Sequence, residues 1–230
     1  MKTKLVLGVA GCAALAVLSL SACLNSPVIP DPGLRGCIEQ TLGLASGEQV
    51  TVEALQTLTE LECNEAGVRS LSGLEHATEL DYLDLWANDI TDLSPLAGLT
   101  NLTFLELAGN RIESLEPLAD MTNLEILEIN ASPIDDVSPL AGLTSLRELY
   151  LFECRIEDVS PLAGLTNLRI LFLLYNNIED VSPLAGLTNL ERLNVAGNPV
   201  TDLSPLDGLD AFIYHDGTLE ELGIDWDLGW

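Results

Sequence analysis

The sequence is poor in basic residues. Its 230 residues include nine lysines and arginines against 36 aspartates and glutamates, and the only two lysines are Lys2 and Lys4. A nucleic-acid-binding protein needs a basic surface to neutralise phosphates, so nucleic acid is excluded as a ligand class. An acidic surface either keeps a protein soluble or attracts a basic partner, and the charge alone does not decide between these.

The residue sets used in catalysis are also missing. Histidine occurs only at His76 and His215, and there is no Ser/His/Asp set, no Cys/His pair with an orienting residue and no glycine-rich phosphate loop. No group of His, Cys and Asp has the spacing of a metal site. We therefore predict that the protein is not an enzyme and has no cofactor or metal.

Long hydrophobic runs are missing except near the N-terminus, where "MKTK" precedes "LVLGVAGCAALAVLSL". A basic start followed by an apolar stretch shorter than the roughly 20 residues of a spanning helix is typical of a secretory signal. The next residues, "LSAC" at 20–23, resemble the lipobox of bacterial lipoproteins. The sequence thus predicts a signal peptide at 1–22 that is removed from the mature protein.

The lipobox resemblance implies cleavage before Cys23 and acylation of this cysteine, with an ordinary cleavage site and a spare thiol as the alternative. Acylation would anchor the protein in the bacterial cell envelope, at the outer membrane or cell surface. Residues 23–32 would form a short, proline-containing tether. Loss of both lysines with the signal leaves a mature net charge of −29.

The middle of the chain repeats every 22 residues. "DVSPLAGLTNL" occurs at 158 and 180, with close variants at 92 and 136. Seven copies fill residues 58–211 without insertion or deletion, in the pattern L-x-x-L-x-L-x-x-N-x-I-x-D-[LV]-S-P-L-A-G-L-T-N. This pattern resembles the internalin-type bacterial leucine-rich repeat. The resemblance implies an α/β solenoid: a horseshoe with a parallel concave sheet, convex 3₁₀ turns and a helical N-terminal cap.

Positions within the repeat, numbered from the first leucine of each copy, have distinct roles. Positions 1, 4, 6, 11, 14, 17 and 20 are apolar in every copy and form the expected core. We expect Ser94 to cap a turn that Pro95 opens, and Asp92 to bond locally rather than to hold calcium. Asparagine at position 9 should satisfy the bend after each strand, and the column departs from asparagine at Ser132 and Cys154.

Both ends of a solenoid need a cap. Residues 33–57 resemble the helical cap of internalins, and residues 212–230 are expected to close the other end, with "AFIYHDG" as an eighth strand and Trp226 and Trp230 as a lid. Cys37 lies on the apolar face of the first cap helix, and Cys63 lies where this cap should dock. In an oxidising compartment we predict a Cys37–Cys63 disulfide, with two buried thiols as the alternative.

Positions 3, 5 and 7 of each strand point out of the concave sheet and are free to bind a ligand. An acidic column runs through Glu62, Asp84, Glu106 and Glu128. The apolar residues expected to be exposed there are Tyr82, Trp86, Phe104 and Ile126, and, in repeats five and six, Tyr150, Phe152, Ile170, Phe172, Leu174 and Tyr175. An exposed apolar patch of this size is typical of an interface, and the alternative is that aromatic side chains on neighbouring strands stack to stabilise the sheet.

The sequence therefore predicts a lipid-anchored extracytoplasmic protein that binds a protein partner, one with a basic surface, through its concave face. A structural or self-associating envelope lipoprotein without another ligand is the main alternative. A small molecule or a glycan on the same face is a further one.

Overall fold

The computed structural model describes residues 28–215 of the chain. The predicted signal peptide, Cys23 with the tether up to residue 27, and the predicted lid from residue 216 onwards lie outside the described residues. Within the described part, no helix combines the length and the apolar character needed to cross a membrane.

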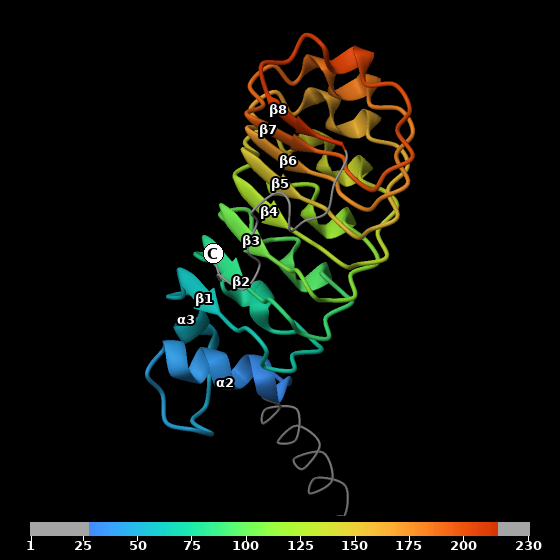
Figure 1. Cartoon of the computed structure of the whole chain (residues 1–230). Coiled ribbons are helices and arrows are strands. Elements are labelled where there is room, and N and C mark those ends of the chain that lie inside the picture. The colour runs from blue at the N-terminus through green and yellow to red at the C-terminus, as the bar shows by residue number, and fades with distance from the viewer. Residues whose placement is uncertain (1–27, 216–230) are drawn as a thin grey trace, which may run out of the picture.

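The described residues form one parallel sheet of eight strands, which lie in the order in which they occur in the chain. The strands are β1 (Glu60–Glu62), β2 (Tyr82–Asp84), β3 (Phe104–Glu106), β4 (Ile126–Glu128), β5 (Glu148–Tyr150), β6 (Ile170–Phe172), β7 (Arg192–Asn194) and β8 (Phe212–Tyr214). Figure 1 shows the sheet as one wall of a curved coil and 3₁₀ turns as the opposite wall. This is the leucine-rich-repeat horseshoe, so the predicted fold class is confirmed.

The opposite wall is built from short 3₁₀ turns, one after each strand from β1 to β7. They are η1 (Leu74–His76), η2 (Ser94–Leu96), η3 (Glu116–Leu118), η4 (Ser138–Gly142), η5 (Ser160–Gly164), η6 (Ser182–Gly186) and η7 (Ser204–Leu206).

The strands pair in a register of one repeat, so that Leu61, Leu83 and Leu105 are successive partners. The same repeat position therefore lies at the same place in every coil. The apolar positions line the interior, and one contiguous buried core runs from Ile29 to Leu206. Because a strand of three residues cannot bury its own side chains, this stacking supplies the stability of the fold.

The 3₁₀ turns begin differently from the prediction. The turn η2 starts at Ser94 itself, and Ser94 does not cap it. Instead, the carboxylate of Asp92 accepts the backbone N–H of Ser94 at 2.8 Å and the Ser94 hydroxyl at 2.9 Å. The predicted serine cap is thus wrong and the predicted local bonding of the aspartate is right. The N–H groups of Leu96 and Ala97 donate to backbone carbonyls, and the Ser94 hydroxyl donates to Asp92.

Asparagine at position 9 holds the bend that follows β2, β3, β6 and β7, whereas the other three copies carry Ala66, Ser132 and Cys154 at this position. Asn88 accepts the N–H of Val68 at 2.9 Å and donates to the carbonyl of Cys63 at 2.8 Å, and so links two coils. Asn110, Asn176 and Asn198 do the same in their coils. These bonds also stabilise a left-handed residue just before the asparagine, which is alanine with φ 55° at Ala87 and glycine with φ 69° at Gly109.

Cys154 takes the place of asparagine in this column, as predicted. Its buried thiol donates weakly to the carbonyl of Ile129, with an S···O distance of 3.6 Å. Ile134, which would bond an asparagine here, donates its N–H to the carbonyl of Ser132 at 2.8 Å instead. Burial raises the pKa of the Cys154 thiol to about 11, so this cysteine remains a protonated structural residue.

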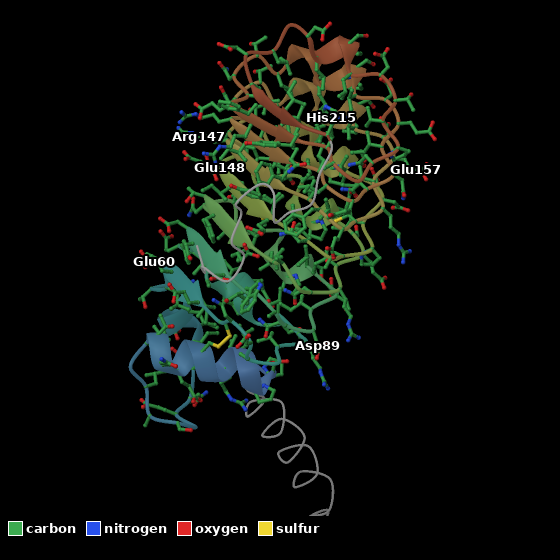
Figure 2. All side chains as sticks on the ribbon, viewed as in Figure 1. Glu60, Asp89, Arg147, Glu148, Glu157 and His215 are labelled. Atoms are coloured by element: carbon green, nitrogen blue, oxygen red, sulfur yellow. A yellow bond between two sulfur atoms is a disulfide. The ribbon has the colours of Figure 1, made fainter. Side chains whose placement is uncertain are left out.

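Two helices cover the β1 end of the core. Helix α2 (Pro32–Thr41) lies across this end, with Leu34 and Ile38 fully buried, and α3 (Val52–Leu55) follows it. Figure 2 shows a disulfide between α2 and the sheet, and it joins Cys37 to Cys63 with a Cα–Cα distance of 5.5 Å. The cap is therefore covalently tied to the first coil.

Asp31 makes a second tie between this cap and the first repeat. Its Oδ1 accepts the N–H groups of Gly33 and Leu34 at 2.9 and 3.0 Å, and caps helix α2. Its Oδ2 accepts the N–H groups of Arg69 and Ser70 at 3.0 and 3.2 Å. Burial alone would raise the pKa of Asp31, but these four N–H groups together hold it below the ordinary value.

We predict that Asp31→Ala lowers the free energy of unfolding by about 2 to 3 kcal/mol, because it removes a helix cap and two bonds between the cap and the first repeat. Urea unfolding at neutral pH measures this, with the exposed Asp81→Ala as a control that should change little. Since the folded-state pKa of Asp31 is lowered, its contribution is present at neutral pH and is lost as the pH falls through that lowered pKa. Equal stability of both variants would contradict this role.

The disulfide predicts a defined thiol count. When the mature protein is denatured and alkylated without reductant, Cys37 and Cys63 should remain unmodified. Peptide mapping by mass spectrometry should find the two peptides that contain them joined. After reduction both should become alkylated, whereas Cys154 should react in denaturant under either condition. Alkylation of Cys37 before reduction would show that the bond does not form in the protein.

Candidate functional site

The concave face is the candidate site, since its outward side chains are not part of the leucine core. Register pairing places Glu62, Asp84, Glu106 and Glu128 side by side on β1 to β4, so the predicted acidic column exists in the structure. Figure 2 shows Glu60 and Glu148 on the sheet side of the molecule and Glu157 on the opposite side. The column therefore faces the hollow of the horseshoe.

An aromatic group lies beside the acidic column on β2 and β3. The rings of Tyr82 and Phe104 stack face to face, with centroids 4.4 Å apart and planes 8° from parallel. Trp86 follows β2 and is 45% exposed. Its backbone N–H donates to the side-chain oxygens of Asn64 and Asp84, each at 3.1 Å. One of these acceptors, Asp84, belongs to the acidic column.

The apolar residues of repeats five and six are less exposed than predicted. Phe172 is only 5% exposed and Leu174 is fully buried, and they form a small second core with Ala196. Tyr150, Phe152 and Ile170 are half-buried against it, as Ile126 is on β4. The exposure predicted for Phe172 and Leu174 is therefore wrong, because large side chains on adjacent strands cover one another and the small Ala196, which follows β7, packs with them.

The geometry of this second core is that of a packed sheet surface. Tyr150 meets Phe172 edge to face at a centroid distance of 5.4 Å and an interplanar angle of 85°. The hydroxyl of Tyr150 donates to Glu148 at 2.8 Å, and burial together with this bond raises the pKa of the tyrosine. Of the predicted residues here, Tyr175 stays exposed at 39%, at the left-handed bend after β6.

Sequence reasoning missed one exposed aromatic. Phe212 is 73% exposed on β8, the last strand of the described sheet. It pairs with Arg192 of β7 at a step of 20 residues instead of 22, so the seventh coil is two residues shorter than the preceding ones. The 22-residue period places Tyr214, and not Phe212, in the column of Tyr82 and Phe104, so the period could not have identified Phe212.

Two carboxyl groups of the acidic column hold a proton between them. Glu106 and Glu128 are partners in adjacent strands, and both are half-buried. Burial, the charge of Glu128 and a hydrogen bond to it raise the pKa of Glu106. Burial also raises the pKa of Glu128, although bonds from Glu106 and Asn130 oppose the rise. Hence Glu106 is protonated near neutral pH and donates to the Glu128 carboxylate.

The carboxylates of the described face are not arranged to hold a metal ion. Among residues 28–215 no cluster of three or more His, Cys, Asp or Glu side chains is arranged to bind a metal ion. The aspartates of the turns, such as Asp136 and Asp158, are instead bonded by the backbone N–H of the serine two residues later, which lowers their pKa. What the concave face offers is charge, aromatic surface and a shared proton.

Comparison with known proteins assigns the class. A sequence profile described as "Leucine Rich repeats (2 copies)" matches residues 100–142, 144–186 and 167–208. A search of curated protein sequences found no significant match. Together with the sheet and the turns, the profile defines a leucine-rich repeat protein, a class that typically serves as a scaffold for protein interactions.

Solved structures narrow the class to a family. An internalin (InlF) of Listeria monocytogenes is 37% identical to this chain with a TM-score of 0.79. The match covers 85% of this chain and 60% of the InlF chain. Internalin C2 of the same species is 33% identical to this chain with a TM-score of 0.67. The match covers 83% of this chain and 95% of the internalin C2 chain. The chain belongs to the internalin family. It spans less than two thirds of the InlF structure.

A more distant likeness concerns the fold alone. The plant peptide hormone receptor RGFR1, solved in complex with RGF2, is 23% identical with a TM-score of 0.55, and the match covers 63% of this chain and 26% of the receptor.

The shared proton predicts an unusual pH dependence of stability. The folded state holds a proton that the unfolded chain releases above the ordinary glutamate pKa, so stability should fall as the pH rises from that value toward the raised pKa. Glu106→Gln keeps the acceptor for the N–H of Ala108 and needs no proton. At about pH 8 it should raise the free energy of unfolding by about 1 to 2 kcal/mol and flatten this slope.

Urea unfolding between about pH 5 and pH 9 measures this effect. Glu62→Gln, an equal charge change on the exposed first member of the column, is the control and should leave the slope unchanged. A wild-type protein whose stability does not fall over this range would contradict the shared proton.

Proposed function

We propose that the protein is a lipid-anchored, extracytoplasmic internalin-type protein that binds a protein partner through the concave face of its repeats. One observation carries the proposal: Trp86 is 45% exposed beside the stacked Tyr82 and Phe104. These residues contribute nothing to the leucine core, and exposed tryptophan and tyrosine are typical centres of protein interfaces.

The location is supported by the sequence and by one bond. The signal-like N-terminus and the "LSAC" motif favour export and acylation at Cys23. The Cys37–Cys63 disulfide is of a kind that persists in oxidising compartments outside the cytoplasm. Both features favour a domain held close to a membrane surface by lipid.

The binding surface is centred on the first half of the sheet. Trp86, Tyr82 and Phe104 would make its apolar part and the acidic column its charged part. The buried Phe172 and Leu174 instead give the second half a rigid surface, over which Tyr150, Phe152 and Tyr175 remain available to a large partner.

Self-association is the second candidate, and the exposure of Phe212 favours it. This apolar residue is 73% exposed on β8, the last strand of the described sheet, where it could pack against a second copy of the chain. A structural envelope protein could use such an end-to-end contact.

Two single substitutions separate the candidates. Wild-type protein and the variants Trp86→Ala and Phe212→Ala are displayed on cells of the native bacterium, cross-linked and analysed by mass spectrometry. We expect Trp86→Ala to reduce the cross-linked protein partner by about tenfold or more, as for an interface tryptophan, and Phe212→Ala to leave it unchanged.

Unchanged capture by Trp86→Ala would reject the concave site. If the main cross-linked species is a homodimer that Phe212→Ala abolishes, self-association is the function instead. Thermal unfolding of each variant shows that the fold is intact, which both exposed positions lead us to expect.

A further inference from the structure

The carboxylates of the concave column have no cationic partners in the described structure. Among residues 28–215 the ion pairs are Arg35–Glu39, Arg69–Asp89, Arg111–Asp89, Arg147–Glu125 and Arg169–Glu191, and none reaches the column. The outward side chains of β1 to β5 include no lysine, arginine or histidine. Along the eight strands of the described sheet, the first basic residue is Arg192 on β7.

The carboxylates of the acidic column therefore repel one another, with no cation among the described residues to offset the repulsion. The groups that face Glu106 and Glu128 from neighbouring strands are acidic or neutral: Glu62 on β1, Tyr82 and Asp84 on β2, Asn130 after β4, and Glu148 and Tyr150 on β5. Parallel strands are about 4.8 Å apart, so the column spans about 14 Å. At this spacing like charges destabilise one another, and the shared proton is what relieves part of the repulsion.

The aromatic group adds a reason to expect a cation rather than any apolar ligand. The stacked Tyr82 and Phe104 and the exposed Trp86 lie on the same strands as Asp84 and Glu106. A guanidinium group both pairs with carboxylates and stacks on aromatic faces, and its attraction to a ring is strongest for tryptophan. Acid and aromatic side chains thus converge on one kind of occupant.

We propose that the concave face of β1 to β4 binds an extended, arginine-rich segment of the protein partner. This inference rests on the proposed function and specifies the partner's chemistry. A cation placed on the column replaces the proton as the source of neutralisation, and the second carboxylate becomes charged. Capture therefore strengthens as the pH rises.

A peptide probe tests this directly. The full mature protein is titrated calorimetrically with an acetylated, amidated peptide of four alternating Arg-Gly pairs, which is long enough to span the column at about 3.3 Å per residue. The same peptide with Glu in place of Arg is the charge control. Titrations at pH 7.5 in phosphate and in Tris, whose ionisation enthalpies differ, count the protons released.

We expect the arginine peptide to bind with release of a fraction of a proton up to one, and its Kd to fall by up to about tenfold per pH unit between pH 6 and pH 8. Glu106→Gln should still bind the peptide but with no proton release and a flat pH profile. Glu179→Gln removes the same charge from an exposed position outside the sheet and should behave as wild type. Added salt should weaken binding.

Three results would overturn the inference: no binding of the arginine peptide, equal binding of the glutamate peptide, or binding without proton release. Loss of proton release in Glu179→Gln as well as in Glu106→Gln would overturn the role of the pair. These failures leave the proposed function standing if Trp86→Ala still abolishes cross-linking of a partner. Unchanged cross-linking by Trp86→Ala, with peptide binding intact, would instead reject the proposed function alone.

Discussion

No repeat of this chain can bury its leucines alone, and the rest of the structure follows from that constraint. Each coil contributes one strand of three residues and one short turn, and only the coils on either side cover its apolar side chains. The strands β1 to β7 accordingly pair at steps of 22 residues, and the step to β8, at the end of the described sheet, is two residues shorter. A strand shifted by one residue would expose its leucines to water. The asparagine bonds between coils and the aspartate bonds in the turns hold each coil to this common shape.

The same constraint creates the chemistry of the concave face. Register stacking places identical repeat positions next to one another, whether or not their side chains attract. Where the position carries aromatic rings, as at Tyr82 and Phe104, the result is a stacked pair. Where it carries glutamates, as at Glu106 and Glu128, the result is repulsion that a proton must relieve. The pairing of equal repeat positions thus produces both the attractive aromatic pair and the repulsive carboxylate pair.

The sequence predicts the features that depend on periodicity alone. Core columns, parallel strands, the position of Cys154 and the neighbours in the acidic column all follow from a period of 22 residues. Features that depend on side-chain size do not. The direction in which Phe172 and Leu174 point was predictable, but their burial depends on Ala196, which follows β7, and on the edge-to-face packing of Tyr150 against Phe172. The choice between Asp92 and Ser94 as the turn acceptor depends on loop geometry, since both residue types accept such bonds.

The common length of the coils from β1 to β7 also determines how such a protein can change over generations. A duplicated or deleted repeat would lengthen or shorten the sheet by one strand, about 4.8 Å, and leave the pairing of the other coils intact. Cap and core would tolerate this event, because α2 and the disulfide touch only the first coil. The length of the concave surface thus changes by whole strands, whereas its selectivity changes by substitution of single outward side chains.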